Sequence, residues 1–98
     1  MKWENQVHIS GTLHKVREDE GRTRFGAYRA FTVRQDTSEE DGTVRKDFLL
    51  VRAYEQEIKD LIVGANEGDP IVVDGEMRSS SGSGEMYILA RQVATKAS

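Results

Sequence analysis

The sequence predicts an all-β domain, a five-stranded barrel with one short helix between the third and fourth strands. Five segments of the 98-residue chain alternate apolar and polar side chains, which is the period of a strand with one buried face. Another segment, 55–64, spaces its apolar residues as a helix does. Gly11 and Gly75 lie inside the first and fourth predicted strands, where a small closed barrel needs sharp bends.

Length and composition indicate one globular domain over 1–98, with an ordered core at about 5–93. The charged fraction of 32% predicts a strongly charged surface. No apolar run approaches the roughly 20 residues that span a bilayer, and the N-terminus lacks the apolar stretch of a signal peptide. We therefore expect a cytoplasmic protein with no membrane contact. The absence of cysteine excludes disulfides, thiolate metal sites and a cysteine nucleophile.

The first two predicted strands are 5–14 and 27–35. Between them, residues 15–24 are charged and contain Gly21, which predicts a turn or loop. After the second strand, the acidic segment 36–43 contains Asp-Gly, a strong turn signal, and predicts an exposed hairpin tip. The side chains expected to point inward from these two strands are Val7, Ile9, Gly11, Leu13, Phe31 and Val33.

The third predicted strand, 45–54, has two different faces. Leu49, Val51 and Ala53 form an aliphatic face, and the opposite face carries Phe48, Leu50, Arg52 and Tyr54. Two aromatic rings beside a guanidinium fill a dry core poorly, but they can stack bases and attract phosphate. The alternative is structural, because the wet outer face of a small antiparallel sheet also alternates and aromatic residues are common in strands.

The second half of the chain predicts a helix and two strands. Ile58, Leu61 and Ile62 form one apolar helical stripe. The fourth strand directs Ile71, Val73, Gly75 and Met77 inward, and the fifth covers 85–93. The Ser/Gly segment 79–84 predicts a flexible hairpin loop, and the tail 94–98 has no predicted structure. This order of elements is typical of a Greek-key barrel of the OB type, with an open antiparallel sheet and one packed helix as the alternative.

The net charge of −3 is unevenly distributed. Residues 1–54 hold 10 basic and 9 acidic side chains, a balance of +1, whereas residues 55–98 hold 4 and 8, a balance of −4. Local potential matters more to a polyanion than total charge does, so the distribution permits a basic groove on a mildly acidic protein.

Four segments in register resemble the bacterial single-stranded DNA-binding protein family, over about 5–93. The matching segments are 5–13 (NQVHISGTL), 31–33 (FTV), 47–54 (DFLLVRAY) and 67–78 (EGDPIVVDGEMR). The resemblance implies an OB-fold that binds single-stranded DNA without catalysis and with little sequence preference, in replication, recombination or repair.

The resemblance also implies a set of binding residues. Phe48 and Tyr54 fall where the family has base-stacking aromatic residues, so stacking on their π-faces is expected to survive. The residues expected to border the groove and contact phosphate are Arg34, Arg45, Lys46, Arg52 and Arg78.

Departures from the family pattern affect affinity and partners. The acidic loop 36–43 and the Ser/Gly loop 79–84 stand where family members usually carry further tryptophans, which predicts weaker binding or a shorter bound strand. The acidic C-terminal tip that recruits replication and repair proteins is missing, so we expect a trimmed or tail-less member. The family, and the need to cover an exposed first strand, imply a homodimer or homotetramer.

The remaining signals are weaker. Trp3 is interpreted as a base-stacking, oligomer-contact or edge-packing residue, and Tyr87, beside Arg91 on the fifth strand, as a DNA-binding or surface residue. His8 and His14 share a strand face but lie roughly 20 Å apart at about 3.3 Å per residue, too far for one metal ion. The acidic runs lack the spacing of calcium loops, and no catalytic motif is present. We expect no metal, cofactor or enzymatic activity.

Two other functions remain open at the sequence level. The same strand face could dock a partner protein, as in a primosome-accessory-like OB domain, which the net acidity and the missing tryptophans favour. RNA or oligosaccharide binding is also compatible, because this fold does not determine the ligand.

Overall fold

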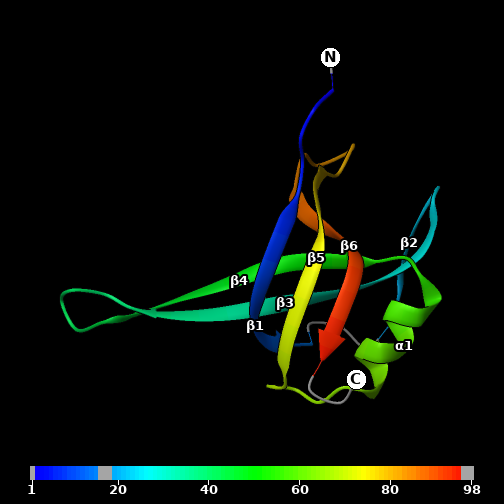
Figure 1. Cartoon of the computed structure of the whole chain (residues 1–98). Coiled ribbons are helices and arrows are strands. Elements are labelled where there is room, and N and C mark those ends of the chain that lie inside the picture. Colours follow the sequence, from blue (N-terminus) through cyan, green and yellow to red (C-terminus); the bar gives the residue numbers. More distant parts are fainter. Residues whose placement is uncertain (1, 16–18, 96–98) are drawn as a thin grey trace.

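The structure is a computed structural model that describes residues 2–15 and 19–95. It is dominated by strands, with one helix placed between β4 and β5 (Figure 1). In chain order the elements are β1 (Val7–His14), β2 (Gly21–Thr23), β3 (Gly26–Ser38), β4 (Val44–Ala53), α1 (Gln56–Gly64), β5 (Pro70–Ser79) and β6 (Met86–Thr95).

Five of the strands close into a ring. Their order is β1-β5-β6-β4-β3, and β3 pairs again with β1 through Thr12↔Arg34, Leu13↔Val33 and His14↔Thr32. The β4–β6 pairing is parallel, and the others are antiparallel. The predicted closed Greek-key barrel of the OB type is therefore confirmed, and the open sheet is not observed.

The short strand β2 corrects the prediction of a loop over 15–24. Gly21–Thr23 pairs with β3 in a tight hairpin in which Gly21 lies opposite Tyr28. The three residues of β2 include one charged side chain and show no apolar alternation, so the sequence does not predict a strand there. This strand forms because β3 supplies its pairing partner. A Cβ at Gly21 would lie 2.5 Å from the Tyr28 ring, so a larger residue here would have to move that ring. Residues 16–18 of the predicted loop lie outside the described residues.

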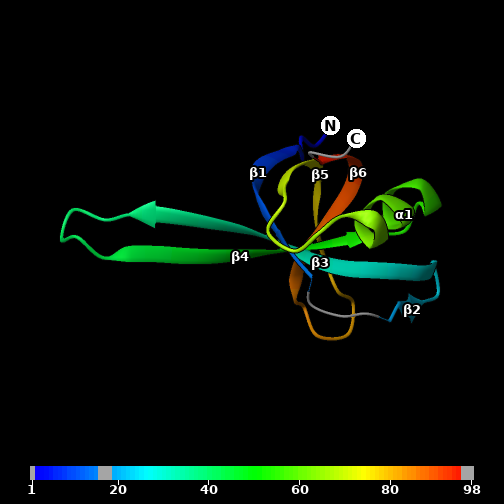
Figure 2. The ribbon, with the colours of Figure 1, turned by 90° about the horizontal axis from the view of Figure 1, so that it is seen from below.

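The hairpin of β3 and β4 is longer than predicted. β3 continues to Ser38 and β4 begins at Val44, so the turn is confined to 39–43 and closes with a hydrogen bond from Glu39 N–H to the Thr43 carbonyl. Gly42 has a φ of 88°, which suits the predicted Asp-Gly turn. The paired ends of the two strands form an arm that projects away from the barrel (Figure 2).

The end of the chain also differs from the prediction. Ala94 and Thr95, expected in an unstructured tail, belong to β6 and pair with Val72 and Ile71 of β5. Residues 96–98 of that tail lie outside the described residues. At the other end of this hairpin, Ser80 N–H donates to the Glu85 carbonyl, so the Ser/Gly segment forms a hydrogen-bonded turn.

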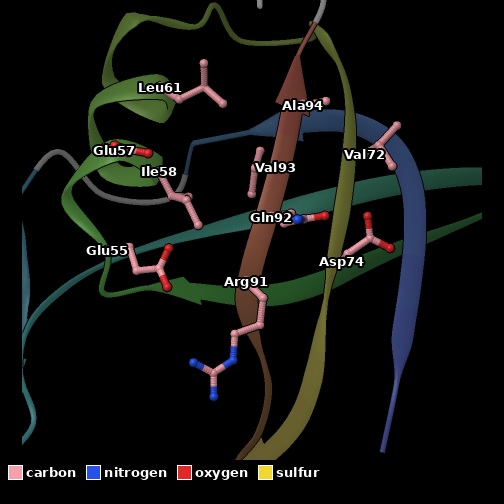
Figure 3. Close-up of a pocket in the computed structure, with 10 residues that line it drawn as sticks. All are labelled: Glu55, Glu57, Ile58, Leu61, Val72, Asp74, Arg91, Gln92, Val93 and Ala94. Carbon is pink, nitrogen blue, oxygen red and sulfur yellow. The ribbon is translucent and has the colours of Figure 1, made fainter.

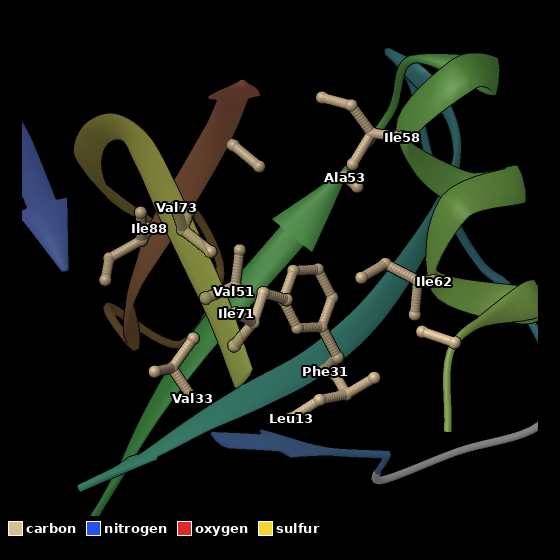
Figure 4. Packing of buried hydrophobic residues seen from close by; sticks show 12 residues of the cluster. Leu13, Phe31, Val33, Val51, Ala53, Ile58, Ile62, Ile71, Val73 and Ile88 are labelled. Carbon is tan, nitrogen blue, oxygen red and sulfur yellow. The ribbon is translucent and has the colours of Figure 1, made fainter. Parts of the chain in front are cut away.

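The core is filled by the inward faces of the barrel strands and by α1 (Figure 4). The predicted inward residues Val7, Ile9, Leu49 and Met77 are only partly buried around it. The fully or nearly buried apolar residues are Leu13, Phe31, Val33, Val51, Ala53, Ile58, Ile62, Ala65, Ile71, Val73, Ile88 and Ala90.

Helix α1 covers one end of the barrel with a stripe that differs by one residue from the prediction. Ile58 and Ile62 are buried, but Leu61 is only half-buried. Lys59 is buried instead, and its Nζ lies 2.8 Å from Glu20 Oε2. This ion pair ties the helix to the segment before β2.

Two glycines permit the ring to close. At Gly11, β1 passes so close to β3 that a Cβ would lie 2.3 Å from the Arg34 carbonyl oxygen. At Gly75, beside a register shift between β5 and β6, a Cβ would lie 2.0 Å from the Leu89 carbonyl oxygen. Both glycines predicted as bends therefore lie where two backbones meet, and beside Gly75 the β5–β6 register shifts by one residue, with Arg91 of β6 as the extra residue.

Substituting Gly75 should destabilise the barrel. In Gly75→Ala the new methyl group must displace the β6 backbone, which should lower the free energy of unfolding by about 1–3 kcal/mol or more. Urea denaturation followed by circular dichroism measures the change. Gly82→Ala is the matched control, because a Cβ there meets no atom within 4 Å. Equal stability of the two variants would contradict this account of closure.

Candidate nucleic-acid interface

The outer surface of β3, β4 and β6 carries most of the predicted binding residues. Alternation directs Phe48 and Arg52 of β4 outward while Val51 and Ala53 enter the core. Arg34 of β3 lies directly opposite Phe48 in the antiparallel register. Tyr87 of β6 reaches the same surface, because β6 is the other neighbour of β4.

Arg52 lies between two tyrosine rings. Its guanidinium carbon is 4.5 Å from the centre of the Tyr28 ring and 4.2 Å from that of Tyr87. The Tyr54 ring lies 5.4 Å from Tyr28 at 47°. We call these four residues the tyrosine cluster. Among the described residues, the neighbours of this guanidinium are aromatic rings rather than a carboxylate, so its charge remains available to phosphate.

Tyr54 is more constrained than the sequence predicts. It is half-buried, and its hydroxyl lies 3.2 Å from Thr23 Oγ1 of β2. That Thr23 oxygen also accepts a hydrogen bond from Phe25 N–H at 3.1 Å. The tyrosine cluster is thereby connected to the β2–β3 turn.

Phe48 forms a second, more open aromatic position. Its side chain is 51% exposed, and its ring contacts His14 edge-on with 5.4 Å between the ring centres. The guanidinium of Arg34 lies 6.0 Å from the Phe48 ring centre. Since a ring can stack a base only through an uncovered face, Phe48 is the better exposed of the two predicted stacking residues.

Three of the predicted phosphate-binding arginines are paired with carboxylates of their own strand. Arg34 donates two hydrogen bonds to Asp36, at 2.9 and 3.0 Å, and these hold the pKa of Asp36 below its usual value. The other two pairs are Arg45 with Asp47 at 3.4 Å and Arg78 with Glu76 at 3.1 Å. Each carboxylate competes with phosphate for its arginine, which reduces the positive potential of this surface.

The arm holds the remaining predicted cation, Lys46. It lies opposite Asp36 in the β3–β4 register and contributes to lowering the pKa of that carboxyl. Arg45 and Lys46 therefore lie along the projecting hairpin, toward the acidic turn and away from the tyrosine cluster.

Trp3 is not packed on a strand edge, and Tyr87 has a different neighbour from the one expected. Trp3 is 83% exposed in the segment before β1, which extends past the end of the barrel (Figure 1). Tyr87 was expected beside Arg91, but it contacts Arg52 instead. Arg91 donates to Glu76, and this hydrogen bond is the largest cause of the lowered pKa of Glu76.

Four residues on or beside this surface are absent from the sequence prediction. Tyr28 and His14 contact predicted residues, and Arg24 stacks on Phe25, which is 75% exposed at the β2–β3 turn. Tyr28 shares the outward alternation of Arg34, a signal that was available. His14 likewise shares the outward alternation of His8. Local alternation carries no such signal for Arg24 and Phe25, because their positions depend on how β2 and β3 pair.

The two histidines pair with acidic residues of other segments. His8 contacts Asp74, and His14 Nδ1 lies 2.7 Å from Glu67 Oε2. Within 2–15 and 19–95, no group of three or more candidate ligands is placed to hold a metal ion. In the same ranges, α1 is too short to cross a membrane, and no other helix is present.

Solved structures share this fold. The small single-stranded DNA-binding protein of Streptomyces coelicolor is 17% identical, with a TM-score of 0.72 over 96% of this chain and 95% of that chain. This chain has the fold of that single-stranded DNA-binding protein. A small single-stranded DNA-binding protein of Mycoplasma pneumoniae is 14% identical, with a TM-score of 0.70 over 98% of both chains.

A third similar structure is a dimer. It is the N-terminal domain of the PriB protein of Thermoanaerobacter tencongensis, 19% identical, with a TM-score of 0.64 over 93% of this chain and 94% of that chain. A scan against protein-family models finds no match, and a search of curated protein sequences also finds none. At these identities the similarity establishes the fold.

Glu67 should make the stability of the protein depend on pH in the acidic range. Hydrogen bonds from Lys15 N–H and then from His14 hold its pKa below the usual 4.5. Because the pKa of Glu67 is lower in the folded state than in the unfolded state, its ionised carboxylate stabilises the fold. This stabilisation is complete at pH values above the unfolded-state pKa and is lost as pH falls through the folded-state pKa. Glu67→Gln should therefore lose less stability than wild type as pH falls from 5 toward 3, measured by thermal unfolding. Glu40→Gln, at the exposed turn of the arm, is the control and should behave as wild type does.

Proposed function

We propose that this protein binds single-stranded DNA without catalysing a reaction, by stacking bases on exposed aromatic rings and by attracting phosphate. The observation that supports this most directly is the position of Arg52 between Tyr28 and Tyr87, on the same outer surface as the exposed Phe48. Rings and guanidinium groups offer stacking faces and positive charge to any base sequence. Two structures of the same fold are of single-stranded DNA-binding proteins.

The proposed path of the bound DNA strand follows β4 from Phe48 to the tyrosine cluster. Arg34 flanks its beginning, and Arg24 with Phe25 extends its end onto the β2–β3 turn. The arginines paired with carboxylates contribute less charge than their number suggests. We therefore expect binding that depends strongly on stacking and weakens as salt rises.

Removing the Phe48 ring should weaken DNA binding without unfolding the protein. Stacking is worth about 1–3 kcal/mol per base, so Phe48→Ala should raise the Kd for an oligo-dT by about 5- to 150-fold. Fluorescence anisotropy at low salt measures the Kd. Val63→Ala is the matched control, because Val63 is similarly exposed, at 57%, on α1.

Two outcomes of this titration would oppose the proposal. Wild-type protein that binds no oligo-dT at low salt would exclude it. Binding that is insensitive to salt would instead favour the alternative in which this surface docks a partner protein. Parallel titrations with single-stranded RNA and duplex DNA would establish which nucleic acid is preferred.

We also propose that the protein forms a homo-oligomer through β1. Residues 7–11 pair with β5 on one edge, whereas pairing with β3 on the other edge starts only at Thr12. An open strand edge is a template for pairing with another chain, and the similar PriB domain is dimeric.

Light scattering coupled to size exclusion tests this assembly. A dimer or tetramer should have two or four times the 11.0 kDa mass of the chain. A species of 11.0 kDa at micromolar concentration would contradict pairing through β1.

A further inference from the structure

A groove lies between α1 and the outer surface of β5 and β6, on different side chains from the tyrosine cluster (Figure 3). Its volume is about 490 Å³, within the range of protein binding clefts. Ile58 and Leu61 point from α1 toward Val93 of β6, and Val72 of β5 continues the apolar surface. Leu61, Val72 and Val93 are only half-buried, so the groove keeps apolar surface in contact with water.

The rim of this groove is acidic on both sides. Glu55 and Glu57 lie on the helix side, and Asp74, which contacts His8, lies on β5. Among the described residues, the carboxylates of Glu55 and Glu57 have no hydrogen-bonding or ionic partner. Among the described residues that line the groove, the cation is Arg91, which contacts Glu76 at 2.6 and 2.8 Å and shares that carboxylate with Arg78.

We propose that this groove binds a basic peptide segment of a partner protein, with an apolar side chain on Ile58, Leu61 and Val93 and flanking Lys or Arg side chains on the acidic rim. Charge complementarity favours this occupant, because unpaired carboxylates repel nucleic acid and attract cationic side chains. The acidic balance of residues 55–98, which the DNA-binding proposal does not use, is thereby assigned a role. The inference does not depend on the proposed function, since the two surfaces use different residues.

Synthetic peptides test the groove directly. The probe is a fluorescein-labelled peptide of alternating Lys and Leu, compared with a Glu/Leu and a Lys/Ser peptide of the same length. We expect the Lys/Leu peptide to bind wild-type protein more tightly than the other two. Amide chemical-shift changes in the wild-type protein should map to 55–61 and 91–94, which needs no variant.

Charge reversal provides the matched comparison. Glu55→Lys combined with Glu57→Lys should weaken Lys/Leu binding by about tenfold or more. Glu39→Lys combined with Glu40→Lys makes the same charge change at the turn of the arm and should leave binding within about twofold. Circular dichroism verifies that both variants fold. If the Glu55→Lys, Glu57→Lys variant does not fold, Glu55→Gln combined with Glu57→Gln replaces it in the comparison.

Several results would overturn the proposal. Equal binding of the Lys/Ser peptide, or equal losses in the two charge-reversed variants, would show only non-specific attraction. Shift changes confined to the tyrosine cluster would place the peptide elsewhere. A lower oligomer mass in the groove variant would assign the groove to a second copy of this chain. The oligo-dT titration of wild type is read separately, so failure of DNA binding would not be mistaken for failure of peptide binding.

Discussion

The close contact between β1 and β3 at Gly11 is the constraint on which the rest of the barrel depends. There β1 stops pairing with β5 alone and begins to pair with β3, so one strand joins both ends of the sheet. A side chain larger than hydrogen at this point would force the two backbones apart. Without that closure the ring would remain an open sheet, with β1 and β3 apart at two ends of the strand order. The members of the tyrosine cluster come from the opposite side of the ring, where β6, β4 and β3 are consecutive paired strands.

Ion pairs within strands shape the electrostatics of the outer surface. Arg34 and Asp36 are two residues apart, as are Arg45 and Asp47, and Glu76 and Arg78. Residues two apart in a strand share a face, so each carboxylate is positioned beside its arginine by the backbone itself. Exposed pairs of this kind add little stability. Their main effect is to leave Arg52, which is held by aromatic rings, as the cation best placed to meet a phosphate.

Much of the fold follows from local alternation. The inward residues Val51 and Ala53, and the outward residues Phe48 and Arg52, were predicted from period two alone. Strand β2 was missed because its partner, rather than its own three residues, holds it in the sheet. Lys59 was missed because its burial depends on Glu20, which is far away in sequence.

The candidate site could be predicted only in part for the same reason. Alternation indicates which residues face outward, but the register between strands decides which of them meet. Tyr28 therefore joined Arg52 and Tyr87 only in the folded chain, and Tyr87 contacts Arg52 instead of Arg91. Each arginine with a carboxylate two residues away can be read from the sequence, but the resemblance assigned these arginines to phosphate contacts and gave no indication of the ion pairs.

The arm of β3 and β4 has a consequence for how far a nucleic acid could extend over the protein. Along its strands Arg45 and Lys46 are balanced by Asp47 and Asp36, whereas its turn carries Glu39, Glu40 and Asp41, so the charge becomes negative toward the tip. A polyanion that extends outward along the arm would therefore be repelled at the turn. Under the proposed function, the acidic turn would limit how far a bound nucleic acid extends along the arm.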